Sequence, residues 1–280
     1  MLIDLITKIK KEQKGFINRI FMKSNPIKEK YKNRKKRLKL KYREDKLAIR
    51  EEYLADVDNY ALTVGKTPPV NPPKRALLEE IGNAVTHGLG SAFAVVALVL
   101  MCIASDGARE YAGALCYFVG EMLMFTFSCL YHAFRNGSAV KRLFRRFDYS
   151  SIYLMIGGTF APILLAYSKS QSSIWFFVIQ WVLIATGITF IGVFGPTRLR
   201  WLHMPLYLLL GWCGLMLIPE MLARGDYLLF GLILGGGAVY SVGVIPFAMK
   251  GKVAHFIWHI FVLAGAIVQW IGIYSVIYLT

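Results

Sequence analysis

The sequence predicts an all-α, polytopic membrane protein, in which a bundle of seven transmembrane helices follows a basic helical N-terminal extension. Apolar residues make up 56% of the 280-residue chain and charged residues only 18%, against about 45–50% and about 25% in soluble globular proteins. The mean hydropathy of +0.47 indicates the same class. This composition excludes a soluble globular enzyme, a disulfide-stapled secreted domain and a disordered chain.

Charge is distributed unevenly along the chain. Residues 1–78 hold 21 Lys and Arg against 9 Asp and Glu, which leaves a net charge of only +4 for the 202 residues that follow. So few charges cannot cover the surface of a soluble domain of that size. We therefore expect a basic, partly amphipathic cytoplasmic extension over residues 1–67, a proline-rich linker over 68–78 and a seven-helix transmembrane domain over 79–280.

The extension begins with a pattern typical of a helix that lies on a membrane surface. Its apolar residues recur at helical spacing with lysines between them, and they are Leu2, Leu5, Ile6, Ile9, Phe16, Ile17, Ile20 and Phe21. The lysines interrupt any signal-peptide core, so we expect the segment to stay in the mature protein. Anionic lipid headgroups are the expected partner of such a basic amphipathic helix.

A second, densely charged helix is expected from Lys28 to Arg50, with charge on several faces. A lipid-facing or solvated helix is favoured over nucleic-acid binding, because no base-reading motif accompanies the charges. The run from Thr67 to Pro73 contains four prolines, which end the helical pattern and form the linker.

Seven apolar runs of about twenty residues follow, each long enough at about 1.5 Å per residue to cross a hydrocarbon core of about 30 Å. The runs are continuously apolar and do not alternate, so helices are expected rather than a barrel. Their expected limits are Glu80–Ala104, Ala112–Phe134, Asp148–Tyr167, Ile174–Phe194, Leu202–Leu222, Tyr227–Phe247 and Ala254–Tyr278. Four cysteines sit singly inside these runs and are interpreted as packing residues, namely Cys102, Cys116, Cys129 and Cys213.

The short loops predict how the bundle is oriented in the membrane. The second loop, from Arg135 to Phe147, carries five basic residues, and the fourth and sixth loops carry two each. The first, third and fifth loops carry one basic residue each. The positive-inside rule therefore predicts a multi-pass protein of the cell membrane with a cytoplasmic N-terminus and an extracytoplasmic C-terminus.

With that orientation, polar residues from three helices share one depth near the cytoplasmic face. His132 ends the second run, and Asp148 opens the third. His255 and His259 open the seventh at a spacing that places both imidazoles on one helix face. Ionisable groups inside a span are costly and are by default candidates for function, and three imidazoles with an open fourth position suit catalytic zinc. A lone histidine such as His203 is more often a packing residue.

Other polar residues surround that set. Ser128 precedes the first of these histidines by one turn, and its hydroxyl either steadies a developing oxyanion or bonds back to the carbonyl one turn earlier. On the first run, Glu80, Asn83 and His87 form one polar stripe. We interpret the stripe as interhelical hydrogen-bond partners around the metal, with His87 the most plausible fourth participant. Glu121 lies nearer the middle of its span and is expected to be a protonated or hydrogen-bonded packing residue.

Four separated motifs recur in order between residues 76 and 280. They are Glu79-Glu80-Ile81-Gly82-Asn83-Ala84-Val85-Thr86-His87-Gly88, Ser128-Cys129-Leu130-Tyr131-His132, the stretch from Asp148 to Pro162, and His255-Phe256-Ile257-Trp258-His259. Together they resemble the haemolysin III branch of the progestin and adipoQ receptor superfamily. The resemblance implies seven helices, a cytoplasmic N-terminus and a zinc ion held by the histidines of SxxxH and HxxxH. A wider relationship to alkaline ceramidases implies metal-dependent hydrolysis of a lipid amide, whereas the family name reflects a cytolytic phenotype.

Three functions fit these patterns. The first is an intramembrane zinc hydrolase that cleaves a lipid amide, such as a ceramide-like substrate, or a lipid ester. Asp148 would then orient or deprotonate the attacking water, with Ser128 as the second catalytic candidate. The second is a signalling or membrane-homeostasis protein in which zinc is structural. The third is a pore-forming cytolysin, which the sequence disfavours because no continuous polar stripe crosses the bilayer. The substrate and the oligomeric state stay open.

Overall fold

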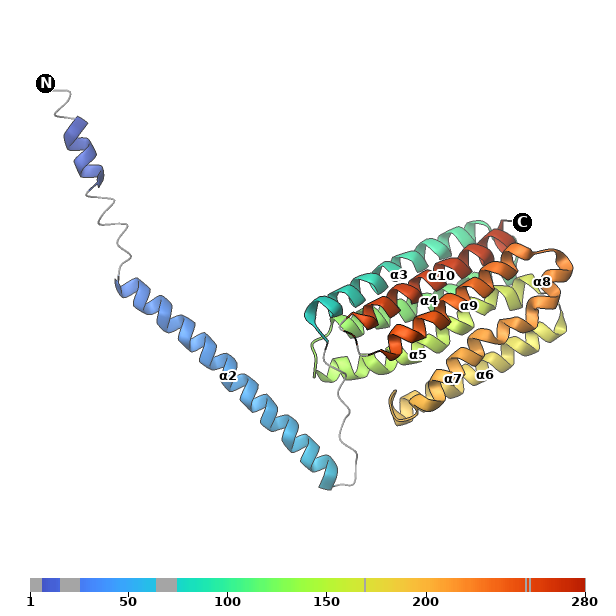
Figure 1. The fold of residues 1–280 in the computed structure, drawn as a ribbon, viewed down its shortest axis with the longest axis horizontal. Helices are drawn as coiled ribbons and strands as arrows, with labels where there is room; N and C mark the ends of the chain where they lie inside the picture. The colour runs from blue at the N-terminus through green and yellow to red at the C-terminus, as the bar shows by residue number, and fades with distance from the viewer. Residues whose placement is uncertain are drawn as a thin grey trace. The chain divides into compact units, whose positions relative to one another are not determined.

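The structure is a computed structural model that describes residues 7–15, 26–63, 75–168, 170–249, 251 and 253–279. The chain divides into two compact units, Met1–Val70 and Asn71–Thr280. The first unit contains a helix over residues 7–15 and the long helix α2, Pro26–Thr63 (Figure 1).

Helix α2 includes the helix that the sequence predicts from Lys28 to Arg50 and extends beyond it on both sides. Of the expected surface helix, Ile9 lies inside the helix of residues 7–15 and is 48% exposed. The other apolar positions of that pattern lie outside the described residues, as do residues 68–74 of the predicted linker. The last two residues of that linker, Leu77 and Leu78, already belong to helix α3 (Leu77–Ile103).

The described residues of the second unit form helices, and seven of the helical segments are long and apolar enough to cross a membrane. In chain order the elements are α3 (Leu77–Ile103), α4 (Ala108–Ala133), α5 (Ala139–Pro162), η1 (Ile163–Tyr167), α6 (Gln171–Phe194), α7 (Arg200–Trp212), η2 (Cys213–Leu217), α8 (Ile218–Arg224), α9 (Tyr227–Ala248), α10 (Ala254–Ile273) and η3 (Tyr274–Tyr278). The all-α class and the number of spans that the sequence predicts are therefore confirmed.

The third span differs from its predicted limits. Helix α5 begins at Ala139 and not at Asp148, so most basic residues of the expected loop lie in the first turns of this helix. Ser138 caps the helix, because its hydroxyl accepts a hydrogen bond from the Lys141 backbone N–H at 3.1 Å. Lysine and arginine are good helix formers, and the buried Lys141 ammonium pairs with the Glu80 carboxylate. The helix therefore includes these basic residues and begins nine residues before the predicted start at Asp148.

Prolines interrupt the spans at defined places. Pro162 ends the α-helical part of the third span, which continues as the π-helical turn η1. The fifth span is composite, since α7 passes through the 3₁₀ segment η2 into α8, where Pro219 occupies the first turn. A proline lacks the N–H that an inner helical turn requires, which explains why both spans change their helical form there.

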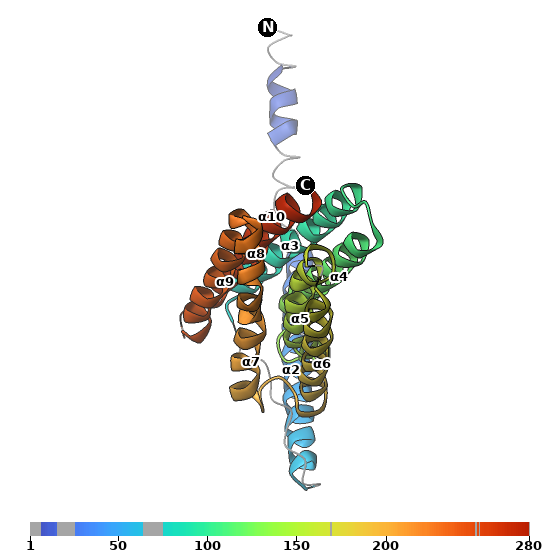
Figure 2. The ribbon, with the colours of Figure 1, turned by 90° about the vertical axis from the view of Figure 1, so that its right-hand side faces the viewer.

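The spans run side by side in one bundle, and neighbours along the chain are mostly neighbours in space (Figure 1). Helix α4 packs between α3 and α5, and α10 packs against both α3 and α9. Helix α7 contacts both α5 and α9, while α6 packs on α5. Figure 2 shows α7 and α9 on one side of the bundle and α5 and α6 on the other. This arrangement places α4, α5, α7, α9 and α10 around one interior space.

Glycines set the closest approach in the bundle. A Cβ atom at Gly158 would meet the Cys116 carbonyl oxygen at 2.7 Å and the Gly120 Cα at 3.2 Å. Helices α4 and α5 therefore pack backbone against backbone, which small residues permit inside membranes. The outer surface is apolar, since large side chains such as Val182, Leu209 and Ile245 are more than half exposed. Such a surface suits hydrocarbon rather than water.

Candidate metal centre and cavity

The predicted site residues come together at one end of the bundle, where α4 ends and α3, α5 and α10 begin. We call it the histidine end. Helix α4 carries His132 in its last turn, and α10 carries His255 and His259 in its first two turns. The reversal of direction between successive helices brings these segments together, although more than 120 residues separate them along the chain.

Three imidazoles form a compact cluster. One ring nitrogen from each of His132, His255 and His259 lies within 4.8 Å of the others. The Nε2 atoms of His255 and His259 are only 3.2 Å apart, and the buried Nε2 of His132 has no hydrogen-bond partner. Two nitrogens bound to one tetrahedral zinc at about 2.0–2.1 Å lie about 3.3 Å apart. The three donors could therefore hold a metal ion, and the spacing of the His255 and His259 nitrogens matches that of two zinc ligands.

A buried ion pair holds the His132 ring from behind. The Oε2 atom of Glu80 lies 2.5 Å from His132 Nδ1, and the Lys141 ammonium donates to Glu80 Oε1 at 2.9 Å. Lys141 also donates to the Phe134 carbonyl oxygen at 3.1 Å and is fully buried. With Nδ1–H donating to the carboxylate, the lone pair of Nε2 faces the cluster, which is the arrangement typical of metal-ligating histidines. The sequence prediction that Glu80 supports the metal centre is consistent with this contact.

The other two residues of the predicted stripe lie beside the cluster. The Asn83 amide nitrogen is 3.3 Å from His132 Nδ1, so this side chain also faces the back of the ligand ring. His87 is fully buried and stacks on His259, with ring centroids 3.8 Å apart, and its two nitrogens have no hydrogen-bond partner. His87 is not one of the three residues whose donor atoms converge.

Asp148 and Ser128 lie together at the same end. Ser128 is buried, Asp148 is half-buried, and the hydroxyl interacts with the carboxylate. Both residues line a cavity that His87, His255 and His259 also line. Asp148 is not part of the converging histidine group. The Asp148 carboxylate therefore faces the same cavity as His255 and His259 without joining their cluster.

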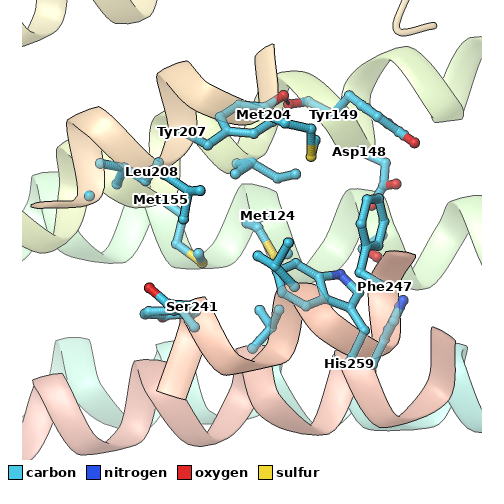
Figure 3. A pocket seen from close by; sticks show the side chains of 18 of the residues that line it. Met124, Asp148, Tyr149, Met155, Met204, Tyr207, Leu208, Ser241, Phe247 and His259 are labelled. Carbon is cyan, nitrogen blue, oxygen red and sulfur yellow. Dashed lines mark hydrogen bonds between the residues drawn. The ribbon is translucent and has the colours of Figure 1, made fainter. Parts of the chain in front are cut away.

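The cavity has a volume of about 140 Å³, against roughly 10–15 Å³ for a space that holds one water molecule. Its lining residues come from α3, α4, α5, α7, α9 and α10, and most of these residues are apolar. In Figure 3, Asp148, Phe247 and His259 lie toward one end, and Met155, Leu208 and Ser241 toward the other. Leu208 is itself 38% exposed on the bundle surface. The cavity is long and apolar enough to hold part of an acyl chain.

Two further sequence interpretations can be compared with the structure. His203 is buried and its Nδ1 lies 2.8 Å from the Tyr153 hydroxyl, so it is a hydrogen-bonded packing residue as expected. Glu121 is fully buried and accepts a hydrogen bond from the Thr159 hydroxyl at 3.2 Å, also as expected. The cysteines are free thiols.

The sequence did not predict three basic residues that lie at the histidine end. Lys141 supports Glu80, and Arg75 and Arg145 line the cavity. A signal for two of them exists in the sequence, because Lys141, Arg145 and Asp148 are spaced by four and three residues. That spacing places all three on one helix face, but only if the helix starts before Lys141.

Comparison with known proteins now identifies the family. The family model described as "Haemolysin-III related" matches residues 75–270. The chain belongs to the haemolysin III family. It is 34% identical over 192 residues to "Hemolysin-3" of Bacillus cereus, covering 67% of this chain and 87% of that protein. It is also 34% identical over 193 residues to the "Hemolysin-3 homolog" of Bacillus subtilis (strain 168), covering 67% of this chain and 89% of the homolog.

A more distant relative supports the wider superfamily. The chain is 26% identical over 213 residues to the human "Monocyte to macrophage differentiation factor", covering 73% of this chain and 87% of that protein. The haemolysin III match includes all three clustered histidines, Asp148 and Ser128, and it leaves residues 1–74 outside. The resemblance that the four sequence motifs indicate is therefore confirmed, and the chain is a haemolysin III family membrane protein with a buried histidine cluster.

Proposed function

We propose that this haemolysin III family protein is a zinc-dependent hydrolase that cleaves an amide or ester bond of a membrane lipid. The observation that carries the proposal is the position of the histidine cluster, which lies at one end of an apolar cavity beside a carboxylate and a hydroxyl. Among the described residues, the cluster contains three metal-ligating side chains and no fourth. Catalytic zinc sites have three protein ligands and an open position, whereas structural sites have four.

In the proposed hydrolysis, the clustered histidines, Asp148 and Ser128 have different roles. Zinc at the three histidines supplies Lewis acidity, which polarises a lipid carbonyl and makes a nearby water more nucleophilic. Asp148 accepts a proton from the attacking water and returns it to the leaving amine or alcohol. The Ser128 hydroxyl orients that carboxylate, and once Asp148 is protonated the hydroxyl can donate to the oxygen that gains negative charge.

The apolar cavity supports a lipid as the substrate. Met124, Met155 and Leu208 provide an apolar wall, which removes an acyl chain from contact with polar groups. The scissile bond lies at the polar end of a lipid's acyl chain, so a chain bound along this wall directs its carbonyl toward the histidine end. The same walls exclude bulk water, which strengthens the interactions of the charged groups at the site.

The orientation and the lipid partners are part of the proposal. The first turns of α5 carry four basic residues at the histidine end, so the positive-inside rule places this end at the cytoplasmic face. The N-terminus is then cytoplasmic and the C-terminus extracytoplasmic. The basic extension binds anionic headgroups of the same leaflet through its lysines and arginines.

A structural zinc site is the second candidate function, favoured by the way the cluster joins helices. His132 comes from α4 and the other two histidines from α10, while Glu80 links His132 to α3. One ion would thus clamp three helices of a signalling or membrane-homeostasis protein. A cytolysin is the third candidate, motivated by the names of the two Bacillus relatives. The mainly apolar cavity walls disfavour a water-filled pore.

Replacement of Asp148 by asparagine tests the hydrolase against the structural candidate. The three histidines remain in Asp148→Asn, so we expect about one zinc per chain and unchanged thermal stability. Asparagine cannot accept the proton, so hydrolysis of a ceramide-like amide or an ester lipid should fall by about 100-fold or more. Zinc content, melting temperature and turnover are measured in both proteins. Full zinc in the wild type without hydrolysis of any amide or ester lipid would contradict the hydrolase and favour the structural site.

A further inference from the structure

Two arginines from distant parts of the sequence line the cavity at the histidine end. Arg75 directly precedes α3, and Arg145 lies in the second turn of α5. Both share the cavity wall with Ser128, Asp148 and His255. A pair of guanidinium groups therefore stands at the same end of the cavity as the proposed catalytic centre.

These guanidinium groups are largely buried, and some of their N–H donors have no hydrogen-bond partner. Arg145 is 9% exposed, and its Nε has no hydrogen-bond partner. The buried Nη1 of Arg75 has none either, and the Arg75 Nε lies 3.9 Å from Glu79 Oε1, near the limit for an ion pair. The guanidinium carbon of Arg145 lies 5.9 Å from the Tyr149 ring centroid, which offsets only part of its lost hydration.

The charge balance of the cavity wall is positive. Of the described residues that line it, the two arginines are the permanent cations and Asp148 is the acidic residue. Buried charges are normally paired, and an unpaired guanidinium is strongly destabilising. An anion that enters the cavity would offer acceptors to the unpartnered Arg75 Nη1 and Arg145 Nε donors.

We propose that Arg75 and Arg145 bind the phosphate of a lipid headgroup, so that the lipid taken into this cavity is a phospholipid. The planar fork of N–H donors in arginine matches phosphate oxygens. In a phospholipid the acyl carbonyls lie between the phosphate and the hydrocarbon chains, and the cavity wall offers arginines, histidines and apolar side chains for these three parts. A neutral ceramide headgroup would leave the Arg75 Nη1 and Arg145 Nε donors without an anionic acceptor. The identity of the substrate rests on the proposed hydrolase function, but the binding does not.

Binding of defined lipids to the purified, zinc-loaded protein in neutral detergent tests this site without any turnover. The probes are fluorescent phosphatidic acid and a ceramide with the same acyl chains. We expect phosphatidic acid to bind more tightly than ceramide in the wild type. In Arg75→Gln and in Arg145→Gln the affinity for phosphatidic acid should fall by about tenfold or more, because each loses a charged hydrogen-bond donor. The affinity for ceramide should stay unchanged.

Arg146 provides the matched control. It neighbours Arg145 on the same helix, is exposed, donates to the Gly192 carbonyl oxygen at 3.2 Å and does not line the cavity. Arg146→Gln should therefore leave both lipid affinities unchanged. If Arg145→Gln fails to fold, Arg75→Gln tests the site alone, since this half-buried residue precedes the first helix of the bundle.

Four results would overturn the proposal. Two are equal affinity of the wild type for phosphatidic acid and ceramide, and an equal loss in the control variant. The third is displacement of phosphatidic acid by inorganic phosphate at cellular concentration, which would assign the arginines to free phosphate. The fourth is displacement by a fatty acid alone, which would assign them to a carboxylate. Hydrolysis of ceramide without selective phosphatidic acid binding would refute this site and leave the hydrolase intact. Selective binding of phosphatidic acid without hydrolysis of any lipid would refute the hydrolase and leave this binding site intact.

Discussion

The buried pair of Glu80 and Lys141 offers a prediction that separates stability from metal binding. Glu80 joins two groups, accepting from Lys141 through one oxygen and from His132 through the other. Glu80→Gln keeps the size of the side chain and removes its charge. The Lys141 ammonium then loses its anionic partner and keeps only neutral ones, such as the Phe134 carbonyl oxygen at 3.1 Å and the Tyr131 ring, whose centroid lies 4.9 Å away.

The size of the effect follows from burial. The Lys141 side chain is 0% exposed and that of Glu80 is 8% exposed, so water cannot replace the lost carboxylate. Removing one partner of such a pair costs about 3–5 kcal/mol, because an uncompensated charge remains buried. The loss of the charged acceptor behind the His132 ring should also weaken zinc binding by about 10–100-fold.

The double variant Glu80→Gln, Lys141→Met distinguishes the two effects. Methionine fills the volume of the lysine stem without a charge, so the double variant should regain most of the stability lost in Glu80→Gln. Zinc affinity should stay low, because the charged acceptor behind the ligand ring is still absent. Unfolding in mixed micelles measures stability, and competition with a chromogenic chelator measures zinc affinity.

Glu220→Gln is the matched control for the same substitution. Glu220 pairs with Arg224, whose side chain is 37% exposed, so its loss should cost at most about 1 kcal/mol. The reasoning is refuted if Glu80→Gln is no less stable than this control, or if the double variant regains full zinc affinity along with its stability. The second outcome would mean that the carboxylate matters only as a counterion of Lys141.

Two further predictions concern the metal and the orientation. His255→Ala and His259→Ala should each reduce zinc content and melting temperature, whereas His203→Ala should leave zinc content unchanged because its imidazole bonds to Tyr153. Elemental analysis measures the zinc content, and thermal unfolding measures the melting temperature. Stoichiometric zinc in a variant lacking all three clustered histidines would exclude the assignment. A reporter fused after Thr280 should be extracytoplasmic and one placed before Met1 cytoplasmic, because every second loop is rich in basic residues and should face the cytoplasm. Finding both reporters on one side would contradict seven crossings.

Most of the residues at the histidine end could be predicted from the sequence alone. The spacing of His255 and His259 is a local property of a helix, so it can be read without a fold. His132 and Asp148 required only the number of crossings, because alternating spans return to the same face. Lys141 and Arg145 were assigned to a loop, since charge was taken to end the third span. The structure shows them on α5, on the face that continues to Asp148.

What the sequence by itself determined is the class of the chain, because seven long apolar runs can satisfy their backbone in lipid only as helices. It also determined the depth of the histidines, which follows from their position along each run. Only the tertiary structure decided which polar groups touch. That Glu80 faces His132 and Lys141 together, that Asp148 stands outside the converging histidines, and that Arg75 reaches the cavity depend on helix rotation and on the packing order. Those are set by close contacts between helices, such as that at Gly120 and Gly158, which connect residues distant along the chain.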